Sequence, residues 1–241
     1  MKFMPSGDRA MVVEFGNEIS TGVNNQVHAL AERIKREQVP GVLELVPTFR
    51  SLMVYYDPWQ TSYPKLRDTF LGSGGLGESA GGRKKRILKI PCCYGARFGP
   101  DLADMEKHTG LDRDEIIAIH SSTDYKVYML GFLPGFVYLG GLDPRLHIPR
   151  LSVPRLKIPK GAVGIGGSQT GVYPLDSPGG WRLIGGTPVD FYDPGRSEPV
   201  LCRPGDYIRF VSVTILDYYD IRQMILRGTY KIDITERGSQ A

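Results

Sequence analysis

The sequence predicts a two-domain α+β protein, with a small split βαβ (ferredoxin-like) domain in residues 1–82 and a β-barrel domain in residues 83–241. Helix-like and strand-like spacings of apolar residues alternate through the first third of the chain. Glycine and small polar residues fill 72–82, which cannot sustain a helix or a strand and therefore marks the boundary. Beyond it, short apolar stretches alternate with Gly/Pro turns, a pattern typical of a β-barrel or a sandwich.

The N-terminal third contains the signals of a β-α-β-β-α order. Ser20 precedes apolar residues at helical spacing, which predicts an N-capped helix that ends at Pro40-Gly41. This order is typical of a split βαβ unit. The remaining elements are expected as strands over 10–15, 42–46 and 52–56, and as a second helix over 63–71.

The rest of the chain is rich in strand signals and contains one clear helix signal. Asp112 and Glu115 have the spacing of a capping box, which predicts a short helix over 115–120. Short strands are expected over 87–91, 125–130, 162–165, 181–184 and 207–213.

Composition narrows the classes of function. Lys and Arg number 30 against 26 Asp and Glu, a balance too mild to argue for nucleic acid as a partner. No apolar run reaches the length of a membrane helix or a signal peptide, so the expected location is the cytoplasm. The cysteines Cys92, Cys93 and Cys202 are expected as reduced, buried thiols, and no metal site is expected. No phosphate-loop motif is present, so any use of ATP would be shared with a partner.

Residues 148–160 repeat a unit of an apolar residue, a proline and a cation every five positions. Prolines at this spacing exclude a helix and impose an extended course. Two interpretations remain open for this Pro-Arg segment. It is either a rigid edge with solvated cations, or Arg150 or Arg155 receives a carboxylate, a phosphate or an acidic surface of a partner.

Residues 167–181 concentrate neutral hydrogen-bonding groups between glycines. Gln169, Tyr173 and Ser177 suit an amide or a heterocyclic ring better than a metal ion. A tight turn with a purely structural role is the alternative.

The segment before the Pro-Arg segment holds two further candidate groups. His120 ends the predicted helix and is either a charged partner of the helix dipole or a general base, and Tyr125 follows it as a candidate for proton transfer or positioning. Phe132, Pro134 and Phe136 either pack on the barrel or line an apolar groove that accepts a partner.

The motifs resemble those of the KipI/5-oxoprolinase B-subunit (PxpB) family, also called allophanate hydrolase subunit 1. The segments that carry the resemblance are YKVYMLGFLPGF (125–136), YLGGLDPR (138–145), the Pro-Arg segment, GSQTGVYP (167–174) and SPGGWRLIG (177–185). The resemblance implies a cyclophilin-like β-barrel as the second domain. It also implies a non-autonomous component of 5-oxoprolinase. The partners would be a larger, KipA-like C-subunit and an A-subunit, and the reaction the ATP-dependent conversion of 5-oxoproline to glutamate.

The resemblance leaves alternatives of function open. One member of the family inhibits autophosphorylation of a sporulation histidine kinase, and the same modules resemble the carboxyltransferase part of urea carboxylase. Two departures from the family pattern are Lys160 in place of an alanine and Gly186 in place of an arginine. If that arginine binds an anion, Lys160 replaces it or the contact is absent.

Overall fold

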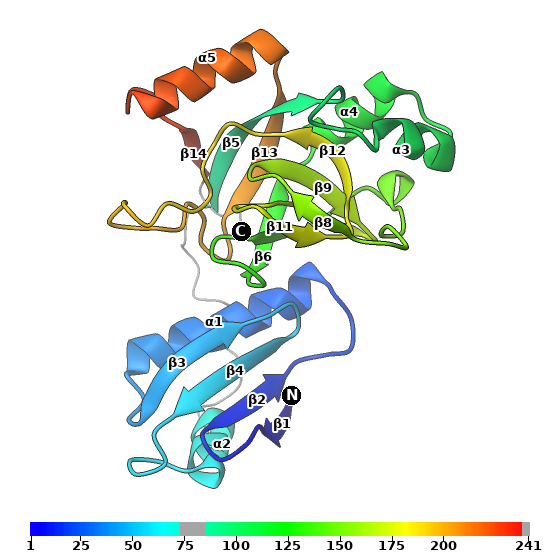
Figure 1. Cartoon of the computed structure of the whole chain (residues 1–241). Helices are drawn as coiled ribbons and strands as arrows, with labels where there is room; N and C mark the ends of the chain where they lie inside the picture. Colours follow the sequence, from blue (N-terminus) through cyan, green and yellow to red (C-terminus); the bar gives the residue numbers. More distant parts are fainter. Residues whose placement is uncertain (73–84, 238–241) are drawn as a thin grey trace. The chain divides into compact units, whose positions relative to one another are not determined.

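The computed structural model describes residues 1–72 and 85–237, which fall into two compact units (Figure 1). Most of the glycine-rich segment at the predicted boundary lies outside the described residues. Within the described ranges, no helix is long and apolar enough to cross a membrane.

The first unit is an antiparallel sheet of order β1-β2-β4-β3 with two helices. Strands β2 and β3 both pair antiparallel with β4, so they run parallel to each other with β4 between them. Helix α1 connects β2 to β3, which confirms the split βαβ arrangement. The elements are β1 (Lys2–Pro5), β2 (Ala10–Glu14), α1 (Thr21–Glu37), β3 (Val42–Pro47), β4 (Ser51–Tyr56) and α2 (Tyr63–Gly72).

Helix α1 begins where the sequence signal places it and ends at Glu37, before the predicted end at Pro40-Gly41. Ser20 Oγ accepts a hydrogen bond from the backbone N–H of Val23 at 3.2 Å, so the predicted N-cap is confirmed. The C-cap is Gln38, whose φ of 46° is left-handed and whose N–H donates back to the last turn. Apolar side chains of α1, α2, β2 and β4 form one core, which includes Val27, Leu30, Ile34, Met11, Leu52, Val54, Leu66 and Phe70.

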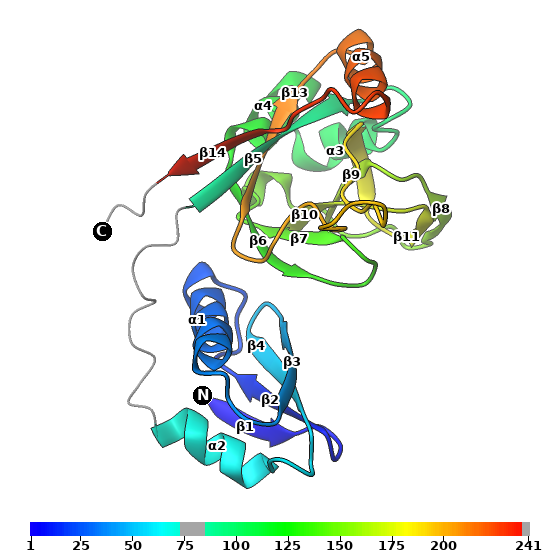
Figure 2. The same cartoon turned by 90° about the vertical axis from the view of Figure 1, so that its left-hand side faces the viewer.

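The second unit is built on a closed barrel of seven strands. Its hydrogen-bonded order is β12-β9-β10-β7-β6-β13-β5, and pairing of β12 with β5 at Gly185↔Tyr94 closes the ring. The predicted barrel is therefore confirmed. β14 (Asp233–Arg237) lies outside the ring along β5, as Figure 2 shows. The ring strands are β5 (Lys85–Tyr94), β6 (Tyr125–Leu130), β7 (Val137–Gly140), β9 (Ala162–Gly166), β10 (Gln169–Val172), β12 (Arg182–Gly186) and β13 (Tyr207–Ser212).

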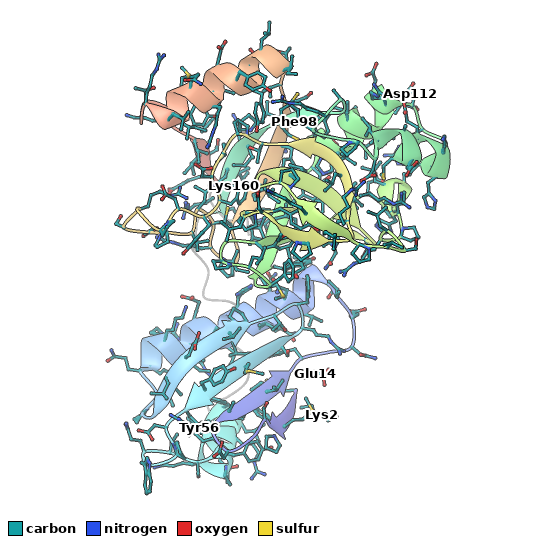
Figure 3. All side chains as sticks on the ribbon, viewed as in Figure 1. Lys2, Glu14, Tyr56, Phe98, Asp112 and Lys160 are labelled. Carbon is teal, nitrogen blue, oxygen red and sulfur yellow. The ribbon has the colours of Figure 1, made fainter. Side chains whose placement is uncertain are left out.

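Side chains fill the inside of the barrel because alternate residues of each strand point inward. The interior includes Leu88, Ile90, Cys92, Val127, Val137, Ile165 and Phe210, all at most 1% exposed. All three cysteines are buried and unpaired, as expected. Helix α4 (Arg113–Ser122) begins with the predicted capping box of Asp112 and Glu115 (Figure 3), and α3 (Leu102–Thr109) precedes it. Both helices place apolar side chains against this core.

Two further features lie outside the ring. Strands β8 (Arg155–Ile158) and β11 (Ser177–Gly179) form a separate two-stranded sheet. Between it and the outer face of the barrel lies a second small core of Phe136, Ile158, Ala162, Tyr173, Trp181 and Leu183. Helix α5 (Ile215–Leu226) lies over β5 and has no buried residue.

Candidate functional site

Four aromatic side chains gather on the outer face of the barrel, and we call Phe136, Tyr138, Tyr173 and Trp181 the outer aromatic cluster. The ring centroid of Phe136 lies 5.1 Å from that of Tyr173 and 5.6 Å from that of Trp181, both edge-to-face. Such edge-to-face pairs add to the stabilisation that burial of the rings provides. Trp181 is 4% exposed and Tyr173 is 2% exposed, so the centre of the cluster is held firmly.

Glycines of β9 and β10 make room for the indole of Trp181. A Cβ on Gly166 would lie 2.6 Å from the indole ring, and a Cβ on Gly171 would lie 3.0 Å from it. Both glycines point outward, because their neighbours in the strands point into the barrel. These glycines therefore leave a flat backbone surface, without side chains, on which the indole of Trp181 packs.

Tyr173 is held in place by the segment that carries Trp181. The backbone N–H of Trp181 donates to its phenol oxygen, and burial raises the pKa of Tyr173, so the phenol stays neutral near pH 7. Gly179 of β11 approaches the same phenol so closely that a Cβ there would lie 2.5 Å from the oxygen. Ser177 lies on the same strand and pairs with Ile158 of β8, a member of the same small core.

Ser177 and Gln169 are polar groups at this outer face. Ser177 is 6% exposed and its Oγ has no hydrogen-bond partner among the described residues. Gln169 of β10 is half-buried and pairs with Gly166 of β9, the glycine that lies against the indole of Trp181. The structure thus brings Gln169, Tyr173 and Ser177 to one side of the barrel, where a buried hydroxyl without a partner is unusual.

Arg150 lies on top of the cluster. Its guanidinium carbon lies 5.8 Å from the centre of the Trp181 ring, within the range of a cation–π contact. The side chain is exposed, and Arg150 also acts on Tyr138 and Tyr173, where its charge lowers pKa values that burial raises. Arg150 is therefore part of the same site as Tyr173.

Arg155 is held by a carboxylate of the chain itself. Its Nη2 lies 2.6 Å from Oδ1 of Asp101, which is 5% exposed. The other oxygen of Asp101 accepts from the N–H of Leu183 at 2.7 Å. The Pro-Arg segment contains no helix, as predicted, but it is a strand only over Arg155–Ile158 and bends at residues 152–153. Arg155 is partly buried and is not a solvated edge cation.

His120 and Tyr125 lie on the opposite side of β10, inside the barrel, and both are 0% exposed. Thr170 points inward from β10 and its Oγ1 donates to the carbonyl of Gly164 at 3.1 Å, so it accepts from His120 Nε2–H at 2.9 Å. His120 Nδ1 then accepts from the phenol of Tyr94 at 2.7 Å. These contacts assign the neutral Nε2–H form to His120.

Burial lowers the pKa of His120 to about 3. The interpretation of His120 as a charged partner of the helix dipole is therefore wrong, because the ring is neutral at physiological pH. Tyr125 donates its hydroxyl to the carbonyl of His120 at 3.0 Å, and burial raises its pKa. A direct role of either ring in proton transfer stays a prediction, and the burial of both rings supports a structural role.

The predicted partner groove is only partly at the surface. Phe132 is 63% exposed with a left-handed φ of 69°, and Pro134 is exposed. Phe136, however, is 2% exposed and packs in the outer aromatic cluster, with its edge-to-face contact to Phe132 at 5.7 Å. Phe136 is therefore a core residue, and only Phe132 and Pro134 are available to a partner.

Three residues of the site do not stand out in the sequence. Trp181 is visible there only as part of a motif, although the glycines at every second position of β9 signal a close neighbour. Tyr138 packs on its near neighbour Phe136 and on the distant Trp181, and Asp101 acts only through contacts distant in sequence, for which no local signal exists. Lys160, labelled in Figure 3, is one of the two alternatives considered for the missing arginine, and it pairs with Asp190 at 2.9 Å. Among the described residues, no group of three or more potential ligands could hold a metal ion.

Comparison with known proteins shows the family to which this chain belongs. Residues 1–202 match the family model "Carboxyltransferase domain, subdomain C and D". The 5-oxoprolinase B-subunit of Bacillus subtilis (strain 168) is 43% identical over 90% of this chain and 95% of its own length. That of Escherichia coli O157:H7 is 41% identical over 85% of this chain and 93% of its own length.

A solved structure has a similar fold and a related sequence. The crystal structure of TTHA0988 is 39% identical with a TM-score of 0.76 and matches 86% of this chain, which spans only 40% of the TTHA0988 chain. Two 5-oxoprolinase B-subunits are therefore more than 40% identical to this chain over nearly their whole length. The chain belongs to the KipI/5-oxoprolinase B-subunit family.

Proposed function

We propose that this chain is the B-subunit of an ATP-dependent 5-oxoprolinase, which opens 5-oxoproline to glutamate together with a larger C-subunit and an A-subunit. The observation that carries the proposal is the 43% identity to a 5-oxoprolinase B-subunit across 95% of that protein. The chain is proposed to contribute to a hydrolase complex and not to act alone. The match to a carboxyltransferase family model describes the same fold and is compatible with this role.

The outer face of the barrel is proposed to bind the substrate. 5-Oxoproline is a five-membered lactam with a carboxylate, a ring N–H and a ring carbonyl. The side-chain amide of Gln169 can donate to such a carbonyl and accept from such an N–H. Tyr173 and Ser177 lie buried beneath this face and both are uncharged, so the floor of the proposed site suits an uncharged amide.

The reaction needs more than this chain is proposed to supply. Water adds to the ring carbonyl, the C–N bond breaks, and the products are a carboxylate and an amine. ATP is proposed to be used through the other two subunits. Gly164, Gly166 and Gly171 lie against Trp181, and the strands that carry them do not lead into a helix N-terminus, where a nucleotide phosphate would bind. A site shared between subunits also accounts for the exposure of Arg150 at its rim.

Reconstitution from purified components tests the proposal. The A- and C-subunits, mixed with ATP and labelled 5-oxoproline, are expected to form labelled glutamate only after this chain is added. The B-subunit of Bacillus subtilis serves as the positive control, and a reaction without ATP as the negative one. Glutamate formed at the full rate from the other two subunits alone would show that this protein is not required.

A further inference from the structure

We propose that Arg150 is the carboxylate receptor of this protein, and that it takes the carboxylate of a small cyclic amide such as 5-oxoproline beside the outer aromatic cluster. The inference rests on the proposed function, because it names the group within that site that fixes the acidic end of the substrate. It assigns this role to Arg150 and not to Arg155, whereas the sequence alone offers both as candidates.

The first argument is the pairing of the cations along the Pro-Arg segment. Lys157 lies 2.8 Å from Oδ2 of Asp176, and Lys160 lies 2.9 Å from Oδ1 of Asp190. Arg155 is paired with the buried Asp101. Each of these three charges is already balanced by a carboxylate of the chain, so an incoming anion would have to compete with it.

Arg150 differs from the other three cations. Within the described residues, its recorded side-chain contact is with the indole of Trp181, and no carboxylate lies within 4.0 Å of it. The five N–H groups of a guanidinium match the two oxygens of a carboxylate, and a cation–π contact of its central carbon leaves these donors without an ion-pair partner. The charge of Arg150 is therefore positioned but not neutralised.

The backbone around Arg150 is fixed on both sides. Ile148 and Gly167 form a bridge of two hydrogen bonds at 3.3 and 2.8 Å. Leu151 donates its N–H to the carbonyl of Gly180 at 2.7 Å, next to Trp181. A fixed backbone that carries a charge without an ion-pair partner limits the ordering that ligand binding requires.

The surroundings fit an uncharged ring attached to the carboxylate. Tyr138 and Tyr173 lie close enough for the charge of Arg150 to act on both, and burial keeps their phenols neutral. On the same outer face, Ser177 Oγ is buried without a partner among the described residues, and Gln169 is half-buried. Together these groups offer one cation and several neutral polar atoms, which complement the carboxylate and the uncharged ring of a lactam carboxylate.

Kinetics of the assembled complex test the inference. Arg150→Ala is expected to raise the KM for 5-oxoproline roughly tenfold while kcat stays within about threefold, because the lost contact binds a part of the substrate that does not react. Arg150→Lys is expected to restore part of the loss. The matched control is Lys157→Ala, whose cation is paired with Asp176 and exposed, and which is expected to leave KM unchanged. A KM unaltered by Arg150→Ala would overturn the inference.

A binding measurement on the full chain separates this inference from the proposed function. The sequence contains two tryptophans, and Trp59 is 94% exposed, so Trp59→Phe leaves Trp181 as the reporter beneath Arg150. Titration with 5-oxoproline is expected to change Trp181 emission in a saturable manner, with roughly tenfold weaker binding in Arg150→Ala. A flat titration would contradict the inference even if reconstitution succeeds. A saturable response in a chain that fails to support catalysis would retain the inference and overturn the proposed function.

Discussion

Replacing His120 with alanine is expected to lower the free energy of unfolding of the barrel unit by about 3–5 kcal/mol. His120 is fully buried, stacks on Phe210 at 4.7 Å, and links Tyr94 to Thr170. Its removal leaves a cavity, takes the hydrogen-bond acceptor from the Tyr94 phenol, and leaves Thr170 with only its bond to the carbonyl of Gly164. Urea unfolding followed by Trp181 emission, in the Trp59→Phe background, measures the change. A loss below about 1 kcal/mol would show that the buried polar chain does not stabilise the barrel.

The pH dependence of stability gives an independent signature of His120. Burial holds its pKa at about 3, whereas an unfolded histidine titrates near 6.5. Below pH 6.5 the unfolded state therefore binds a proton that the folded state does not, and stability falls by about 1.4 kcal/mol per pH unit. Because the unfolded histidine is only half protonated at pH 6.5, the expected loss between pH 6.5 and 5 is about 1.7 kcal/mol.

Two variants isolate this effect. His120→Gln removes the titrating ring and is expected to flatten the stability profile between pH 6.5 and 5, whereas His108→Gln alters an exposed histidine and is expected to keep it. Carboxylates with a lowered pKa, such as Asp176 beside Lys157, act below this window, because their unfolded-state pKa values lie near 4. A slope that persists in His120→Gln would assign the pH dependence to another group.

Asp101→Asn is expected to lower the free energy of unfolding by about 2–4 kcal/mol. The carboxylate of Asp101 joins the start of α3 to β12 and β8, since it binds the N–H of Leu183 and the guanidinium of Arg155. Without the charge, Arg155 is left partly buried and unpaired. Urea unfolding with the Trp181 reporter gives the value.

Asp104 provides the matched control for Asp101. It lies 2.6 Å from Arg182, the same distance as in the Asp101–Arg155 pair, but its side chain is 52% exposed against 6% for Asp101. Because water screens an exposed pair, Asp104→Asn is expected to cost less than about 1 kcal/mol. Equal losses in the two variants would mean that burial does not set the strength of the Asp101 pair.

Much of the fold follows from local signals in the sequence. Strand β6 occupies the predicted residues 125–130, and the caps at Ser20 and Asp112 start helices as expected. Helices α3 and α5 are absent from the sequence-based prediction. Helix α5 has a capping box of Thr214 and Asp217 that is a recognisable signal, but it has no fully buried residue, and its partly buried apolar side chains lie among exposed ones such as Leu216 and Met224. The short strands β7 and β10 each contain glycine, which weakens a strand signal.

The candidate site is predictable in its residue types but not in its grouping. Gln169, Tyr173 and Ser177 follow from the density of polar groups between glycines. Their position relative to His120 does not follow, because a shift of one residue along β10 turns a side chain from the outer face to the interior. The pairing that separates Arg155 from Arg150 depends on Asp101, which is distant from both in the chain. Contacts of that kind depend on the tertiary fold.

The most direct test of the outer-face site is the turnover of 5-oxoproline by the purified complex that contains Gln169→Ala. Assembly is checked by the mass of the complex, and Gln223→Ala, an exposed glutamine on α5, is the matched control. The structure leads us to expect at least a roughly tenfold loss of kcat/KM in Gln169→Ala, with full assembly and wild-type turnover in the control. Wild-type turnover by a fully assembled Gln169→Ala complex would contradict the placement of the substrate on the outer face of the barrel.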